Sequence, residues 1–208
     1  NERYAITNNR SSFAFWLNRR AFAPITGGSP LIAELMPAVA EITEALIREY
    51  INRAVSDVFK TMIGREPTFS TKVPSGAGRE LIVSAPDRPQ VVGTVGFVGE
   101  CNGLVYLHLD LAFARMCTCQ LLVMTEAELD EAGDEVINDA IGELTNMTVG
   151  SFKNGLCDAG HPCMLTIPSI LRGTNFSIEP LSSAVRHVYY FDCAQHRVVA
   201  DILMKSDE

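Results

Sequence analysis

Features that would place a protein in a membrane or outside the cell are scarce in this chain of 208 residues. No apolar run approaches the ~20 residues that cross a bilayer, and no secretory signal pattern opens the sequence. The six cysteines are few for this length and lie mostly inside apolar runs, which is typical of reduced thiols in a core. We therefore expect a cytoplasmic protein without membrane insertion.

Positive charge is also in short supply. The chain has 17 Lys and Arg against 25 Asp and Glu, which gives a net charge of -8 and a pI near 5.0. Nucleic-acid backbones and anionic membranes require clustered basic side chains. We expect no nucleic-acid partner, and a protein partner with a basic rim fits this charge better.

The motifs of common catalytic centres are missing as well. Cys117-Thr-Cys119 and His161-Pro-Cys163 lack the ligand spacing that identifies a zinc site. No Gly-rich phosphate loop occurs, and none of the four histidines lies near Ser or Cys in a nucleophile motif. The sequence therefore predicts no metal and no cofactor of the protein's own.

The first third of the chain divides into an arm and a helical segment. Residues 1–28 mix polar and aromatic side chains and end at glycines and a proline, which predicts an N-terminal arm that stays disordered, folds back on the domain or docks on a partner. From 30 to 63, apolar residues recur with helical spacing, interrupted by Pro37 and stopped at Gly64. We expect a helical extension over 29–50 and the main domain over 51–208. The apolar stripe at 31–51 fits packing on its own sheet or a homodimer interface.

After residue 64 the pattern alternates between strands and helices. Alternating apolar residues predict strands at 68–73, 80–84, 90–98, 103–109, 163–170, 174–178, 185–192 and 197–204. Helices are predicted at 111–124 and 134–153, and Asn102-Gly103 indicates a hairpin. A long helix followed by strands occurs twice. The sequence thus predicts an α+β fold with two long helices on a largely antiparallel sheet and an internal pseudo-two-fold repeat.

The predicted helix at 134–153 has a polar stripe made by Asp139, Glu143, Asn146 and Gly150. At ~100° per residue, Glu143 and Asn146 lie about 60° apart, with Asp139 and Gly150 between them. A carboxylate and a carboxamide one turn apart offer a partner a charged anchor and a neutral hydrogen-bonding group. The glycine lets another surface approach closely. An ordinary solvated helix face has the same spacing.

A longer string of residues favours a functional stripe. Glu-Leu-Thr-Asn-Met-Thr-Val-Gly at 143–150, followed by Met-Leu-Thr-Ile-Pro-Ser-Ile-Leu-Arg-Gly at 164–173, resembles the CheC/CheX family of chemotaxis phosphatases, and the CheX branch more closely. The family signature has an acidic residue or Ser, then Glu, Asn and Pro at set spacings. Asp139, Glu143, Asn146 and Pro168 occupy those places, with the last interval one residue short. The resemblance covers roughly residues 50–205.

The resemblance implies a phosphatase that removes the phosphoryl group from the aspartyl phosphate of a CheY-like response regulator. Asn146 would orient the attacking water, and Glu143 would pair with the active-site Lys of the regulator. Asp139 would contact the partner at the rim, and Gly150 would allow close approach or simply serve helix packing or termination. Mg²⁺ is expected on the regulator. The family also implies a homodimer.

The number of sites depends on how the two halves are aligned. If Gly64 is aligned with Gly150, Asp57 and Lys60 stand in place of Glu143 and Asn146. Aligning Met62 with Met147 puts Val58 and Thr61 there. Neither alignment gives a Glu/Asn pair in the first half, so we expect a single site.

Two other function classes fit the same sequence. One is a non-catalytic binding or scaffold module for a phosphorylated receiver domain or a flagellar switch component. The other is a structural dimerisation domain. The intact Glu143 and Asn146 favour the phosphatase, because a pure binding module has no evident need for the carboxamide.

Overall fold

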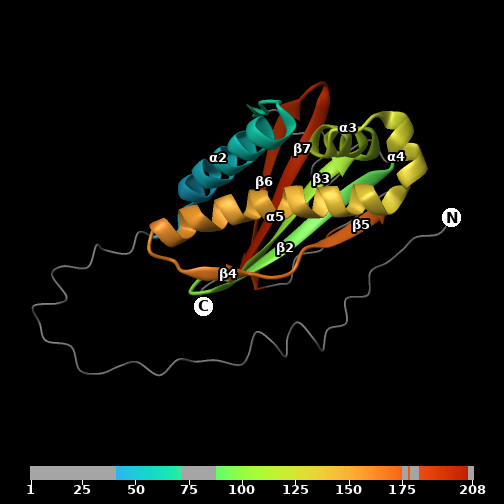
Figure 1. Ribbon diagram of the computed structural model, residues 1–208. Coiled ribbons are helices and arrows are strands. Elements are labelled where there is room, and N and C mark those ends of the chain that lie inside the picture. Colours follow the sequence, from blue (N-terminus) through green and yellow to red (C-terminus); the bar gives the residue numbers. More distant parts are fainter. Residues whose placement is uncertain (1–40, 72–87, 175–177, 179–182, 206–208) are drawn as a thin grey trace, which may run out of the picture. The chain divides into compact units, whose positions relative to one another are not determined.

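The chain folds as helices that pack on one antiparallel sheet (Figure 1). The computed structural model describes residues 41–71, 88–174, 178 and 183–205. The helices of this part are α2 (Glu44–Ile63), α3 (Leu111–Leu122), α4 (Glu126–Ala132) and α5 (Asp134–Asp158). The strands are β1 (Thr68–Ser70), β2 (Gln90–Gly99), β3 (Gly103–Asp110), β4 (Cys163–Leu165), β5 (Ser169–Gly173), β6 (Ala184–Cys193) and β7 (His196–Lys205).

The seven strands form one sheet in the order β1-β6-β7-β3-β2-β4, and β5 also pairs with β2. Every pairing is antiparallel. The order reads the same from both ends when β1, β2 and β3 are exchanged with β4/β5, β6 and β7. An internal two-fold repeat would produce this order, although the repeat itself stays a prediction.

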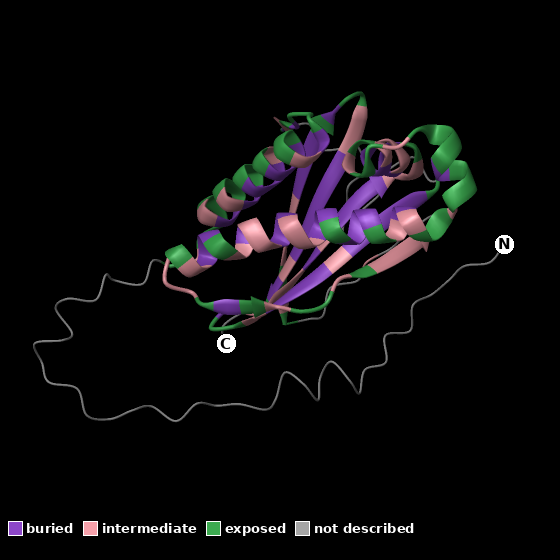
Figure 2. Ribbon diagram, in the orientation of Figure 1, coloured by how far each residue is buried: buried purple, intermediate pink, exposed green. Residues whose placement is uncertain are grey.

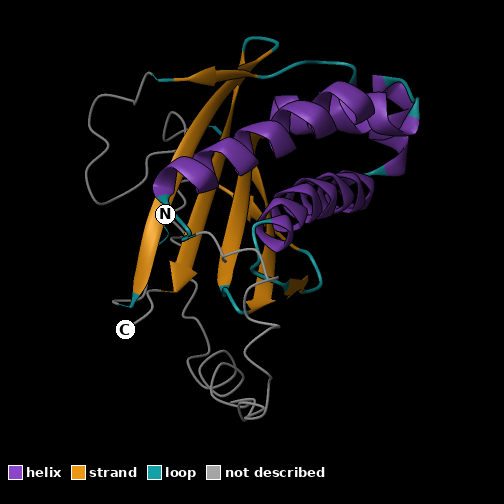
Figure 3. Ribbon diagram, turned by 90° about the vertical axis from the view of Figure 1, so that its left-hand side faces the viewer, coloured by secondary structure: helices purple, strands orange, loops and turns teal. Residues whose placement is uncertain are grey.

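The core lies between the sheet and the helices α2, α3 and α5, which cover the same face (Figures 1 and 3). Alternate residues of each strand point toward them, as a period of two requires. In β7, for example, Val198, Ala200 and Ile202 are fully buried in this core. The expected α+β architecture is confirmed.

Helix α2 begins later than the apolar pattern suggests. Thr43 has an extended backbone, and its side chain accepts a hydrogen bond from the Leu46 N–H. It is therefore the N-cap, and the helix predicted from residue 30 does not include residues 41–43. Residues 30–40 lie outside the described part. Ile47 and Ile51, in the stripe considered for dimerisation, are buried in the core of their own domain. The expected domain boundary at residue 50 falls inside this continuous helix.

The strand predicted at 163–170 is two strands. Leu165 pairs with Phe97 and Ser169 with Thr94, so three residues of one strand oppose two of β2. This is a β-bulge, and it comprises Thr166, Ile167 and Pro168. Proline has no N–H to donate to β2, and regular pairing stops around it.

The strand predicted at 68–73 ends at Ser70 in β1. The hairpins β2–β3 and β6–β7 and the helix α3 are confirmed within one or two residues. The strand predicted at 80–84 and most of that at 174–178 lie outside the described residues. The two described residues of the latter, Thr174 and Ile178, are not in a strand.

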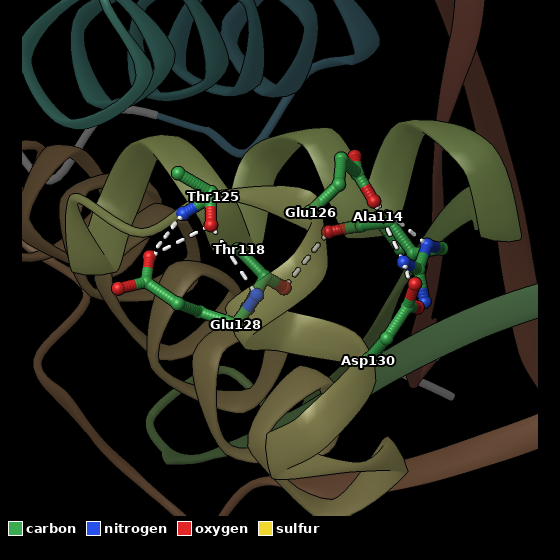
Figure 4. Close-up of polar contacts among 7 residues, drawn as sticks. Ala114, Thr118, Thr125, Glu126, Glu128 and Asp130 are labelled. Carbon is green, nitrogen blue, oxygen red and sulfur yellow. Dashed lines mark hydrogen bonds and ion pairs between the residues drawn. The ribbon is translucent and has the colours of Figure 1, made fainter.

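The connection from α3 to α5 is a short helix fixed by polar contacts (Figure 4). Thr125 caps α4, and Glu128 accepts a hydrogen bond from the Thr125 N–H in return, which makes a capping box. Arg115 of α3 bridges Glu126 and Asp130 of α4 at 2.6 Å each. These contacts hold the acidic segment that leads into α5.

The sheet face away from the helices contains a buried ion pair. Arg186 donates to both carboxylate oxygens of Asp201, at 2.8 and 2.7 Å, and Asp201 is fully buried. Burial raises the pKa of Asp201, against the lowering effect of Arg186. His108 lies beside the pair, and burial, together with the Arg186 charge, lowers its pKa to about 3. His108 is therefore neutral at pH 7.

We predict that Arg186→Ala lowers the free energy of unfolding by roughly 3–5 kcal/mol, because it leaves the Asp201 carboxylate buried without its cation. Urea denaturation at pH 7 measures this. Arg197→Ala, which removes the partially exposed pair with Asp192, is the control and should cost less than about 1 kcal/mol. Equal losses from both variants would contradict the structural role of the Asp201 pair.

Candidate functional site

The polar stripe lies on α5, which is held at its N-terminal end by a glycine and an arginine. Gly133 has φ 85° and ends α4 where α5 begins. Arg172 of β5 forms an ion pair with Asp134 at 2.8 Å. The helix continues to Asp158, five residues beyond the predicted end at 153.

The buried side of α5 fits closely against the sheet and α2. A Cβ at Gly93 of β2 would lie 1.9 Å from Thr145 Oγ1, so the helix can only sit here because residue 93 is glycine. The Phe152 ring meets Phe97 edge to face at 5.9 Å. Gly155 approaches the Tyr50 ring of α2 so closely that a Cβ would clash at 2.7 Å. These contacts fix which side of α5 faces outward.

Exposed and half-buried residues alternate with buried ones along α5 (Figure 2), and the predicted site residues are among those that are not buried. Asp139 and Glu143 are exposed, and Asn146 and Gly150 are half-buried. The structure gives Asp139, Glu143 and Asn146 no hydrogen-bond or ion-pair partner among the described residues. Their polar groups are therefore available to a second molecule.

Gly150 lies in the interior of α5, so it does not terminate the helix. A Cβ there would meet only Leu165 Cδ1, at 3.8 Å, which is an ordinary van der Waals contact. The packing of this domain therefore leaves room for alanine at residue 150.

The two ends of the bulge between β4 and β5 face α5 on either side of Asn146. Gly142 faces Ile170 of β5, and Gly150 faces Leu165 of β4. Asn146 is midway between these two glycines on α5, and the bulge is midway between Ile170 and Leu165. Pro168, the last residue of the predicted motif, is part of this bulge. The structure thus brings Pro168 to the same region as Asn146.

Thr166 holds the bulge in place, a contact that the sequence alone did not reveal. Its N–H donates to the Gly96 carbonyl at 2.8 Å, and its Oγ1 accepts from the Gly96 N–H at 2.9 Å. A side-chain oxygen thus replaces the backbone acceptor that the irregular strand lacks. The only sign of this interrupted strand in the sequence was Pro168, which directly follows the β-branched Ile167.

The side chains of this site are suited to positioning a reactant by hydrogen bonds. No nucleophilic Ser or Cys lies on the stripe, and no group of three or more metal-ligating residues occurs in the described part of the chain. The carboxamide of Asn146 both donates and accepts hydrogen bonds without bringing charge. Such a site orients a reactant that another molecule activates.

The buried thiols do not take part. All six cysteines are free, and four of them are buried. Burial raises the pKa of Cys163 to about 12 and also raises the pKa of Cys117.

Among the described residues, no helix is long and apolar enough to cross a membrane.

Comparison with known proteins gives matches at the level of a family and of folds. Residues 91–192 match the family described as chemotaxis phosphatase CheX. The structure is similar to the CheX of Vibrio vulnificus, with 20% identity, a TM-score of 0.62, and coverage of 82% of this chain and 100% of that one. It is also similar to CheX in a CheX–CheY–BeF₃–Mg²⁺ complex from Borrelia burgdorferi, with 19% identity, a TM-score of 0.59, and coverage of 77% and 98%.

A third similar structure has a different name. FliY of Thermotoga maritima is 17% identical, with a TM-score of 0.53 and coverage of 80% of this chain and 92% of that one. No curated protein matches the chain. At these identities the structural likenesses establish the fold. The family match covers residues 91–192, a range that contains α5 with Glu143 and Asn146. The chain belongs to the CheX family of chemotaxis phosphatases, which hydrolyse the aspartyl phosphate of CheY.

Proposed function

We propose that this protein hydrolyses the aspartyl phosphate of a CheY-like response regulator with Asn146 as the residue that orients the attacking water. The observation that carries the proposal is the half-buried, unpartnered carboxamide of Asn146 on α5, beside the bulge that contains Pro168. Its amide can hold a water by donating and accepting while remaining neutral next to a phosphoryl dianion. A carboxylate in the same place would repel that dianion.

The reaction needs little from the phosphatase besides placement. The oxygen of water forms a bond to phosphorus, and the bond between phosphorus and the aspartyl oxygen breaks. The regulator recovers its carboxylate, and both hydrogens of the water leave with the inorganic phosphate. The regulator's own Mg²⁺ and Lys neutralise the phosphoryl oxygens, so that alignment of the water is the remaining contribution to the rate.

Glu143 is assigned a binding role. It lies one turn before Asn146 and is exposed without a partner. A charge-assisted pair between this carboxylate and the active-site Lys of the regulator would hold α5 in register. Asp139, one turn earlier and also exposed, would contact the rim of the partner.

A related complex supports the choice of partner. The CheX of Borrelia burgdorferi was crystallised with CheY, BeF₃ and Mg²⁺, and BeF₃ stands in for the phosphoryl group on the regulator. The Mg²⁺ in our proposal likewise belongs to the regulator. Homodimerisation of this protein stays a prediction.

The non-catalytic alternative is a scaffold that binds a phosphorylated receiver domain. The fold alone does not choose between these classes. The two differ at Asn146, because a scaffold would retain its function without a carboxamide that positions water.

We predict that Asn146→Ala lowers the rate of dephosphorylation at least severalfold while leaving the fold intact. Decay of a ³²P-labelled regulator, with and without the variant, measures the rate, and circular dichroism checks the fold. Asn154→Ala, two turns further along α5 and exposed, is the matched control and should retain the wild-type rate. A wild-type rate of dephosphorylation for Asn146→Ala would contradict the role of Asn146 in orienting the water.

For Glu143→Gln we expect a KM for the phosphorylated regulator that is about 10-fold or more higher, with a smaller change in kcat. Hydrogen bonds to charged groups contribute about 1.5–3 kcal/mol, which corresponds to this range. Asp158→Asn removes the same charge from an exposed site at the end of α5 and should leave KM unchanged. An unchanged KM for Glu143→Gln would remove the anchoring role and leave the role of Asn146 untouched.

The variant Gly150→Ala distinguishes a role of this glycine in the close approach of the regulator from a role in packing within the domain. The new methyl group fits against Leu165, so we expect the free energy of unfolding to rise by about 0.5–1 kcal/mol through helix propensity. KM should nevertheless increase, because the methyl group projects into the contact with the regulator. Gly142→Ala, whose Cβ would meet Ile170 at 3.9 Å in a buried place, should stabilise similarly without changing KM. If Gly150→Ala leaves KM unchanged, the glycine has no part in binding.

A further inference from the structure

Ile167 is an exposed apolar side chain in the bulge between β4 and β5. Among the described residues, five large apolar side chains are exposed, and the other four are Leu122, Val123, Met164 and Val185. Ile167 is 86% exposed and is the one of the five that lies in the bulge. It belongs neither to the core of the described residues nor to the side chains packed against it. The fold therefore does not need an apolar side chain at this position.

The segment that contains Ile167 runs alongside α5 (Figure 1). Leu165 and Ile170, on either side of Ile167, face α5 one turn after and one turn before Asn146. A specific protein interface covers about 800 Å² of each partner, which is more than a stripe of four helical residues provides. A regulator whose phosphoryl group reaches Asn146 therefore also covers neighbours of the stripe, and this segment is one of them.

The backbone on both sides of Ile167 is held in place. Thr166 exchanges two hydrogen bonds with Gly96, at 2.8 and 2.9 Å, and its Oγ1 donates to the Ile167 carbonyl at 3.4 Å. Pro168 has a fixed φ and restricts the residue before it to extended conformations. The β-branched side chain of isoleucine itself has few rotamers. Contact of Ile167 with a partner therefore costs little conformational entropy.

Ile167 offers a kind of contact that the stripe beside it lacks. Asp139, Glu143 and Asn146 present polar groups, and their pairing with a partner is offset in part by the loss of their hydration. An apolar side chain contributes through the area that is removed from water, whatever the charge of the partner. Protein interfaces typically combine a buried apolar anchor with polar groups around it.

We propose that Ile167 is the apolar anchor of the interface with the response regulator, and that it fits into an apolar depression beside the regulator's phosphorylated aspartate. The inference rests on the proposed function of α5 and adds a contact that determines affinity. Ile167 does not touch the reacting atoms, so it acts on binding and not on the chemical step. A regulator with a charged surface at that place binds weakly, which makes Ile167 a determinant of the regulator that is accepted.

The test is the KM and kcat of the full chain with Ile167→Ser, for CheY phosphorylated by a small-molecule phosphodonor. We expect KM to rise about 10-fold or more, as the loss of one buried isoleucine side chain implies, while kcat stays unchanged. Ile167→Leu keeps the apolar area and should retain a KM near that of the wild type. Val185→Ser changes an exposed β-branched residue of β6. It is the matched control and should leave both parameters unchanged.

Salt distinguishes the contact of Ile167 from that of Glu143. An ion pair of an exposed carboxylate is screened as the ionic strength rises, whereas the burial of apolar area is not. Titration with CheY activated by BeF₃ and Mg²⁺ gives the Kd of each variant. The ratio of Kd between Ile167→Ser and the wild type should be the same at low and at high salt, and the ratio for Glu143→Gln should shrink at high salt. A ratio for Ile167→Ser that shrinks in the same way would contradict an apolar contact.

The outcomes separate this inference from the proposed function. If the wild-type chain accelerates dephosphorylation and Ile167→Ser leaves KM and Kd unchanged, the anchor is overturned and the function of α5 stands. A fall in kcat alone overturns the anchor as well. If the wild-type chain binds activated CheY without accelerating dephosphorylation, and Ile167→Ser weakens that binding, the anchor stands and the phosphatase function is overturned. Absence of both binding and acceleration overturns both.

Discussion

The position of α5 on the sheet depends on the missing side chain at Gly93. The Cβ of any other residue there would lie 1.9 Å from Thr145 Oγ1, so the helix would have to move away from the sheet. Thr145 itself is fully buried and satisfies its hydroxyl by donating to the Ile141 carbonyl at 2.7 Å. Because each helix residue is rotated by ~100° from the one before, Glu143 lies about 200° and Asn146 about 100° around the helix from Thr145, so an inward Thr145 turns both away from the sheet. One close contact, between Gly93 and Thr145, thus determines which way the polar stripe of α5 faces.

The bulge gives the family proline a physical role. Pro168 does not touch the chemistry in our scheme, yet it interrupts β-pairing at the point where the strand passes Asn146. Thr166 compensates by supplying both a backbone donor and a side-chain acceptor to Gly96. Bulges occur often beside active sites because they redirect a strand locally at little cost to the rest of the sheet.

Sequence patterns predicted the parts of the fold that rest on local chemistry. The hairpin at Asn102-Gly103, the helix α3 and the stripe on α5 follow from turn residues and periodicity, and the structure contains them. The start of α2 was predicted too early because the apolar pattern begins at residue 30, whereas Thr43 caps the helix. A capping residue decides where a helix begins even when the periodic pattern extends beyond it. The split of 163–170 required knowing that Thr166 could replace a backbone acceptor, which depends on a residue 70 positions away. Non-local contacts of this kind leave no periodic signal.

The alignment of the halves shows why a glycine is a poor marker of equivalence. Gly64 has φ 67° and ends α2, whereas Gly150 is an ordinary helical residue on an outward face. The same residue type meets two different physical requirements. Strand bounds and buried positions are better markers, because a core accepts a change in register only when all its contacts change together.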